Sequence, residues 1–343
     1  MSDLLLKLNM PSFVPFPLFK TGVQQTIAAR YYPYRTHIDN SILHSVTLSD
    51  GDKIVLVENT PIHIQPMTRS ILLIHGLTGS NQSCYLLRLT RRFVKQGYRV
   101  FRMNLRGCGL GAKLAKQIYH SGRSDDPRTV LKYLANLYPH SPVTQIGFSI
   151  GANITLKMAG EDGPERSGNC DSIIAVSPPL DLKASVKLIT HPLNTIFDQR
   201  FVKDLVKHAY DLHRWYPETP LPVFPKKLNL YEFDNCYTSV RAGFKDANDY
   251  YEKNSSIHFL PSIELPAFIL HARDDPFISR RTLAQIPQKE NLQNQKLDVL
   301  ITKQGGHVGW LGQSSKRGDL RWMDDIIVKW VNWHNNQTTS LFK

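Results

Sequence analysis

Residues 143–158 read VTQIGFSIGANITLKM and contain the pattern Gly-x-Ser-x-Gly at Gly147, Ser149 and Gly151. A run typical of a β-strand precedes the pattern, and a run typical of a helix follows it. A sharp turn between strand and helix forces its central residue into a strained backbone conformation, which only glycine-sized neighbours can accommodate. The stretch therefore predicts a turn that presents the Ser149 hydroxyl at a helix N-terminus, where the helix dipole favours developing negative charge.

The same pattern has a plain structural explanation, a glycine-rich turn in which the Ser149 side chain caps the following helix. If Ser149 is instead a nucleophile, it needs a general base and an acid that orients the base, because a serine hydroxyl alone reacts poorly at neutral pH. In folds built around this turn the acid and the histidine come later in the chain, each on a loop after a strand. We therefore expect both partners downstream of residue 151.

A histidine follows the last predicted strand. Residues 297–301 (LDVLI) read as a strand, and residues 302–307 (TKQGGH) follow it. Because two glycines precede His307, its backbone is free to turn the imidazole ring toward the serine. The chain has thirteen histidines, and only His307 has this placement. We predict His307 as the general base; the alternative is an ordinary histidine on a surface loop.

Two adjacent aspartates follow the strand predicted at residues 267–271 (AFILH). Asp275 precedes Pro276-Phe277 and occupies the position from which the acid points inward, so we predict that it orients His307. Asp274 is expected to cap the loop, a common role for aspartate in turns. It remains the alternative acid.

A further loop follows the strand predicted at residues 70–74 (SILLI) and reads His75-Gly76-Leu77-Thr78. Stabilising the oxyanion of a tetrahedral intermediate requires two backbone N–H groups aimed at one point. We predict that Leu77 and Ile150 supply them, since one lies in this loop and the other directly follows the serine. His75 is expected to organise the loop by hydrogen bonding.

The rest of the chain alternates between strand-type and helix-type runs. The strand-type runs lie at residues 70–74, 99–103, 143–147 and 172–176, and the helix-type runs at residues 85–95, 127–137 and 152–158. This alternation indicates a parallel sheet covered by helices on both faces. Residues 43–59 differ, because two alternating runs flank Asp50-Gly51-Asp52, a sequence typical of a β-hairpin.

The alternation breaks between about residues 180 and 262, which are helix-like and rich in aromatic residues and lysine. Strands return at residues 267–271 and 297–301, and a last amphipathic helix is predicted at about residues 321–334. The predicted parts are an N-terminal arm of residues 1–40, a core of residues 41–179 and 263–343, and a helical cap or lid of residues 180–262.

Composition restricts the partners. The net charge is +13, but the basic residues are scattered, and no dense basic run or aromatic RNA-binding signature occurs, so nucleic acid is not expected. A solvated basic surface explains the charge; weak attraction to an anionic membrane surface is the second interpretation. The motif HExxH is missing and the histidines lack metal-ligand spacing, so neither metal nor other cofactor is expected.

The expected compartment is cytoplasmic. The four cysteines lie far apart without a CxxC pair, which favours reduced thiols. No apolar run approaches the roughly 18 residues of a membrane span, and Asp3 and several prolines interrupt the N-terminal region, which reads neither as signal peptide nor as anchor. Cys108 is only a weak candidate for a reactive thiol, because Ser149 occupies the nucleophile position.

Several motifs together resemble the YheT-type branch of the α/β-hydrolase superfamily, esterases related to the medium-chain ester hydrolases and acyltransferases of eukaryotes. The motifs are HGLTGS (75–80), NLRGCG (104–109), YHSG (119–122), GFSIGAN (147–153), HARDDPF (271–277) and GGHVGWLG (305–312). The resemblance implies an α/β-hydrolase fold, a mostly parallel sheet covered on both faces with a helical cap insertion, and a triad at Ser149, Asp275 and His307. The chain departs from the family at Val23, where a histidine is frequent, which leaves the role of residues 22–26 open.

The resemblance and the residues together predict a metal-independent serine hydrolase that cleaves carboxylic esters through an acyl-enzyme. The expected substrate is a small-molecule or lipid-like ester with a short- to medium-chain acyl group, because the predicted cap would supply an apolar inner face. Two alternatives use the same fold: transfer of the acyl group to an alcohol, and a non-catalytic binding protein. The oligomeric state is left open.

Overall fold

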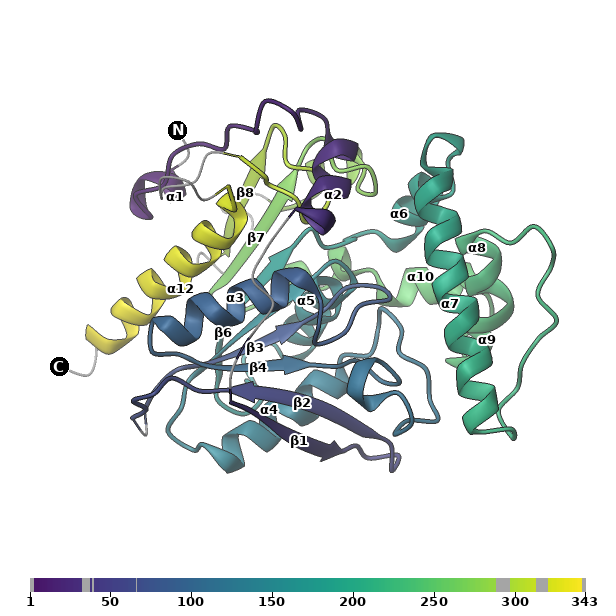
Figure 1. The fold of residues 1–343 in the computed structure, drawn as a ribbon, viewed down its shortest axis with the longest axis horizontal. Coiled ribbons are helices and arrows are strands. Elements are labelled where there is room, and N and C mark those ends of the chain that lie inside the picture. Colours follow the sequence, from purple (N-terminus) through teal and green to yellow (C-terminus); the bar gives the residue numbers. More distant parts are fainter. Residues whose placement is uncertain are drawn as a thin grey trace.

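The computed structural model describes residues 3–32, 38, 40–65, 67–287, 297–312 and 320–340. Within these residues, eight strands form one sheet in the order β1-β2-β4-β3-β5-β6-β7-β8 (Figure 1). The strands are β1 (Ser41–Thr47), β2 (Lys53–Asn59), β3 (Ser70–Ile74), β4 (Arg99–Met103), β5 (Val143–Phe148), β6 (Cys170–Val176), β7 (Ala267–Ala272) and β8 (Leu297–Thr302). The β1–β2 and β2–β4 pairs are antiparallel, and all other pairs are parallel.

Both faces of this sheet are covered, as a parallel sheet requires. Along β3 the side chains alternate between two hydrophobic cores: Leu72 and Ile74 belong to one, and Ile71 and Leu73 to the other. Helices α4 (Asp125–Leu137) and α5 (Ile150–Asp162) bury their apolar residues in the first core; α1 (Asp3–Lys7), α3 (Cys84–Lys95) and α12 (Trp322–Ser340) bury theirs in the second. The predicted mostly parallel sheet with helices on both faces is confirmed.

A helical segment connects β6 to β7 and lies together at one end of the molecule (Figure 1). It contains α6 (Leu182–Ile189), η2 (Pro192–Asn194), α7 (Thr195–Trp215), α8 (Leu230–Phe233), η3 (Asp234–Thr238), α9 (Ser239–Arg241), α10 (Ala247–Asn254), η4 (Ser256–His258) and η5 (Leu260–Ser262). The helices predicted between about residues 180 and 262 are therefore present, whereas the division into core and lid stays a prediction. The long helix α7 ends just before the first of the clustered prolines, which cannot continue a helix.

The N-terminal region lies over the end of the molecule that carries β8 and α12 (Figure 1). Helix α2 (Gly22–Tyr31) begins with a capping box, in which Thr21 and Gln24 exchange side-chain and backbone hydrogen bonds. At its other end, the Arg321 guanidinium donates to the carbonyls of Ala29 at 3.2 Å and Tyr32 at 2.8 Å. Residues 3–32 are thus packed onto the remainder of the chain.

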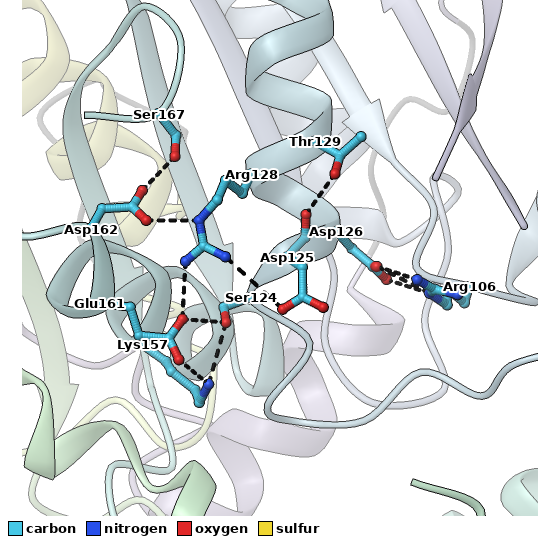
Figure 2. Close-up of polar contacts among 10 residues, drawn as sticks. All are labelled: Arg106, Ser124, Asp125, Asp126, Arg128, Thr129, Lys157, Glu161, Asp162 and Ser167. Carbon is cyan, nitrogen blue, oxygen red and sulfur yellow. Dashed lines mark hydrogen bonds and ion pairs between the residues drawn. The ribbon is translucent and has the colours of Figure 1, made fainter. Parts of the chain in front are cut away.

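Polar contacts anchor the loop after β4 and join α4 to α5 (Figure 2). Arg106 is 3% exposed, and its Nε donates to both carboxylate oxygens of Asp126 at 2.9 and 3.0 Å. Arg128 on α4 donates to Asp162 on α5 at 2.7 Å. Because a buried guanidinium needs such partners, Arg106 gives the motif NLRGCG a structural role in fixing this loop.

Two short helices remain: η1 (Gly109–Gly111) follows β4, and α11 (Arg280–Ala284) follows β7. Among the described residues, no helix combines the length and the apolar character needed to cross a membrane.

Candidate active site

Ser149 lies in the turn between β5 and α5, with a φ of +53° and a ψ of −122°. A Cβ on Gly147 would lie 2.2 Å from the carbonyl oxygen of Gly151, and one on Gly151 would lie 2.5 Å from that of His75. Both glycines are therefore required by close backbone contacts around the serine. The Ser149 side chain makes no capping hydrogen bond to α5, so the alternative of a helix-capping serine is wrong.

The imidazole of His307 lies between Ser149 and Asp275. Its Nε2 is 2.9 Å from Ser149 Oγ, and its Nδ1 is 2.8 Å from Asp275 Oδ2. A carboxylate can only accept, so Nδ1–H donates to Asp275, and Nε2 is left to accept the serine proton. Side chains from the turn after β5 and from the loops after β7 and β8 thus form one hydrogen-bonded chain.

The two adjacent aspartates have different partners. Asp275 accepts a second hydrogen bond at Oδ1 from the N–H of Phe277 at 2.8 Å, and its side chain is fully buried. Asp274 accepts from the N–H of Gly306 at 2.9 Å, and burial raises the pKa of its carboxyl. Asp275 therefore contacts the imidazole of His307 itself. Asp274 contacts the backbone of the loop that carries His307, residues 303–312, hereafter the histidine loop.

The loop after β3 passes close to the serine, since a Cβ on Gly76 would lie 2.9 Å from Ser149 Cβ. His75 organises this loop as expected: Nδ1 donates to the Gly76 carbonyl at 2.8 Å, and Nε2 accepts from the N–H of Leu105 at 3.1 Å. Burial lowers the pKa of His75 to about 4, which keeps the ring neutral at physiological pH.

The backbone N–H groups on either side of Leu77 donate hydrogen bonds to tyrosine hydroxyls. The Tyr85 hydroxyl accepts from Gly76 N–H at 2.9 Å, and the Tyr119 hydroxyl accepts from Thr78 N–H at 3.2 Å. The N–H of Leu77 between them has no hydrogen-bond partner within the described part of the chain, and neither has that of Ile150. The N–H groups of Leu77 and Ile150 are therefore both free to donate beside the serine. Tyr119 belongs to the motif YHSG, but neither that motif nor the sequence around Tyr85 indicates a hydroxyl that accepts from this loop.

A cavity of about 80 Å³ opens at this site, and Leu77, Ser149, Ile150 and His307 all line it. Most of its remaining wall is apolar and comes from the segment between β6 and β7 and the loop after β7. These side chains include Leu182, Val186, Phe201, Leu205, Leu230 and Phe277. A reacting group bound at Ser149 would therefore lie against an apolar surface.

Polar groups interrupt this apolar wall. The Tyr251 hydroxyl donates to Asp234 Oδ2 at 2.8 Å, and burial raises the pKa of Asp234 to about 6. Ser185 is 3% exposed, and its Oγ has no partner among the described residues. Tyr250 also lines the cavity, and its hydroxyl accepts from Ser121 N–H at 2.9 Å. No sequence motif marks Asp234 or Ser185; only the folded chain brings them to the cavity.

Acid should destabilise the fold through three buried histidines. Burial lowers the pKa of His75 and His271 to about 4 and that of His120 to about 3, whereas unfolded histidines titrate near 6.5. The unfolded chain therefore binds more protons between these values, so the free energy of unfolding falls as pH drops from about 6.5 to 4. Carboxyls whose pKa burial raises, Asp234 and Asp274 among them, oppose part of this loss. We expect a slope of about 2–3 kcal/mol per pH unit near pH 5 in urea denaturation series.

His271 offers the control for that slope, because both of its ring nitrogens lack a partner among the described residues. His271→Leu removes one titrating group and should reduce the slope near pH 5 by about 1 kcal/mol per pH unit. A slope identical to that of the wild type would show that His271 does not contribute.

Within the described residues, no group of three or more His, Cys, Asp or Glu side chains is placed to hold a metal ion. Residues 69–311 match the family model described as the α/β hydrolase fold. The chain is 30% identical to "Putative esterase YheT" of Escherichia coli (strain K12), over 93% of this chain and 92% of that protein. It is 29% identical to "Monoacylglycerol lipase" of Saccharomyces cerevisiae, over 78% of this chain and 60% of that protein.

Among solved structures, Est1E from Butyrivibrio proteoclasticus with bound ferulic acid has a TM-score of 0.53 at 12% identity, covering 83% of this chain and 97% of that one. At this low identity, the similarity supports a shared fold and nothing more. The family match and the identity to YheT over nearly the whole chain confirm the resemblance seen in the motifs. The chain belongs to the α/β-hydrolase fold family, among relatives that include the YheT-type esterases.

Proposed function

We propose that the protein is a serine hydrolase that cleaves carboxylic esters, with Ser149 as nucleophile, His307 as general base and Asp275 as the acid that orients it. The observation that carries the proposal is the hydrogen-bonded chain through His307, 2.9 Å to the serine and 2.8 Å to the carboxylate, at an apolar cavity. The names of the relatives, an esterase and a monoacylglycerol lipase, support the same reaction class.

The reaction follows from these positions. Ser149 Oγ attacks the ester carbonyl while His307 Nε2 takes its proton, and Asp275 stabilises the imidazolium that forms. The N–H groups of Leu77 and Ile150 bind the oxyanion. The tetrahedral intermediate collapses, His307 protonates the departing alcohol, and an acyl-enzyme remains. Water then attacks the acyl carbon, giving its proton to His307, which returns it to Ser149 as the acid leaves.

The cavity favours short- to medium-chain acyl groups. Its volume is about 80 Å³, whereas a single water molecule needs about 10–15 Å³ on the same measure. The space therefore accepts roughly five to eight atoms the size of a methylene group. Its apolar wall favours a hydrocarbon chain, since each buried methylene contributes about 0.8 kcal/mol.

A series of p-nitrophenyl esters from acetate to dodecanoate tests the reaction and the chain length together. We expect kcat/KM to be highest between butanoate and octanoate and to fall at least about tenfold by dodecanoate, which exceeds the cavity. Adding an alcohol such as glycerol and measuring the product ratio distinguishes hydrolysis from acyl transfer. If no ester is cleaved and no serine reacts with a fluorophosphonate, the protein is a non-catalytic member of the fold.

A further inference from the structure

Helix α2 contacts the histidine loop, although the family-model match begins only at residue 69. Thr26 Oγ1 accepts a hydrogen bond from the backbone N–H of His307 at 2.8 Å and donates one to the Gly22 carbonyl at 2.7 Å. Thr26 on α2 therefore bonds the backbone of His307, the residue whose ring contacts Ser149. Because the hydroxyl is itself held by the helix backbone, it fixes the position of His307 relative to α2.

Gln25 holds the far end of the histidine loop. Its side chain is fully buried, and its carboxamide bonds both backbone groups of Leu311: Oε1 accepts from the N–H at 2.7 Å, and Nε2 donates to the carbonyl at 2.8 Å. Nε2 also donates to the Phe19 carbonyl at 2.5 Å. This pairing needs an acceptor and a donor on one side chain, which an amide supplies and a carboxylate does not.

The contact between α2 and the two catalytic loops is close enough to require glycine. A Cβ on Gly22 would lie 1.7 Å from the carbonyl oxygen of Asp274, and one on Gly306 would lie 2.3 Å from the Gly22 carbonyl oxygen. The helix therefore lies directly against both the loop after β7, which carries Asp275, and the histidine loop. Gly306, directly before the histidine, is therefore required by this packing, whereas Gly305 packs against the Trp310 ring.

The histidine loop needs such support because it is strained. Val308 and Trp310 have φ angles of +55° and +48°, a region that residues with bulky side chains rarely adopt. A conformation of this kind persists only where surrounding contacts impose it. Gln25, Thr26 and Ser177, whose Oγ accepts from Val308 N–H at 3.2 Å, supply side-chain contacts to the loop backbone.

We propose that α2 is a positioning element of the active site, in which Thr26 and Gln25 hold His307 at the distance that lets it take the proton of Ser149. The inference rests on the proposed function. Neither residue touches the reacting atoms; both act through the backbone of the histidine loop. Catalysis is sensitive to such placement, since a displacement of about 1 Å can cost about 10²-fold in rate.

Thr26→Val tests the inference by removing the acceptor for His307 N–H while keeping a branched side chain. We expect kcat for p-nitrophenyl butanoate to fall about 10–100-fold with KM within about threefold, because the ester cavity is unchanged. Thr26→Ser, which keeps the hydroxyl, should restore kcat to within about threefold of wild type. Gln25→Glu should behave like Thr26→Val, because its carboxylate cannot donate to Leu311. Val23→Ala is the matched control on the same helix, since that side chain is 41% exposed.

Rates are expressed per active site titrated with a fluorophosphonate, so that a loss of folded protein does not count as a loss of kcat. If Thr26→Val and Gln25→Glu keep the wild-type kcat per titrated site and lose only thermal stability, or if they raise KM alone, the inference is wrong and the proposed function stands. If the wild-type protein cleaves no ester, the proposed function is wrong, and the inference that rests on it is wrong with it.

Discussion

Replacing Ser149 with alanine should lower kcat for p-nitrophenyl butanoate by at least about 10⁴-fold, because the acyl-enzyme can no longer form. In a serine protease the loss of the nucleophile costs about 10⁶ in kcat, and a residual acceleration remains from the oxyanion hole and binding. KM should change little, since alanine leaves the cavity and the donors of Leu77 and Ile150 in place. Steady-state kinetics measure the loss, and covalent labelling by a fluorophosphonate should disappear with it.

Cys108→Ala is the matched control, because Cys108 is the thiol in the motif NLRGCG that could otherwise serve as a nucleophile. Burial raises the pKa of this thiol to about 12, so it stays protonated and unreactive near neutral pH. We expect labelling and kcat close to those of wild type. Retention of ester hydrolysis by the purified Ser149→Ala protein would show that another group performs the attack.

The fold was predictable where local pattern decides the structure. The strand predicted at residues 70–74 coincides with β3, because a continuous apolar run bounded by turns is typical of a strand buried in a covered sheet. The strand predicted at residues 99–103 coincides with β4. The hairpin around Gly51, whose φ is +86°, follows from the turn residues. The position of β4 between β2 and β3 was not predictable, since alternation along the chain does not reveal which strands pair.

Some residues of the candidate site were predictable from the sequence, and others were not. Ser149, Asp275 and His307 could be nominated because each follows a strand within a short motif, and the structure brings their side chains together. Thr26 and Gln25 could not, because their contacts join segments more than 280 residues apart and no local signal describes such a pairing. The resemblance pointed to residues 22–26 through the departure at Val23, but the contacts to the histidine loop come from the neighbouring positions.

The cavity shows a further limit. The helices predicted between about residues 180 and 262 are present, and side chains of this segment form most of the cavity wall, whereas the division into core and lid stays a prediction. The sequence did not predict that Asp234 would line the cavity, because it lies in a π-helical turn, a local irregularity that periodicity does not reveal. Irregular turns of this type are frequent at functional sites, and local sequence rules predict them poorly.

Asp275→Asn should lower kcat by about 10⁴-fold, the effect of the equivalent change in serine proteases. Asparagine keeps the shape of the side chain and can still accept from Phe277 N–H. Its NH₂ group, however, would face Nδ1 of His307 and favour the tautomer that carries the proton on Nε2. That nitrogen could then no longer accept the proton of Ser149. The measurement is kcat for p-nitrophenyl butanoate, with KM expected to remain near the wild-type value.

Asp274→Asn is the matched control, since it makes the same chemical change one residue away. Asparagine can still accept from Gly306 N–H, so a neutral hydrogen bond replaces a charge-assisted one; the loss of about 1 kcal/mol limits the effect to roughly tenfold. The ratio of the two variants therefore identifies the acid, because both substitutions make the same isosteric change from carboxylate to carboxamide. The opposite ranking, a tolerated Asp275→Asn and an inactive Asp274→Asn, would assign the orienting carboxylate to Asp274.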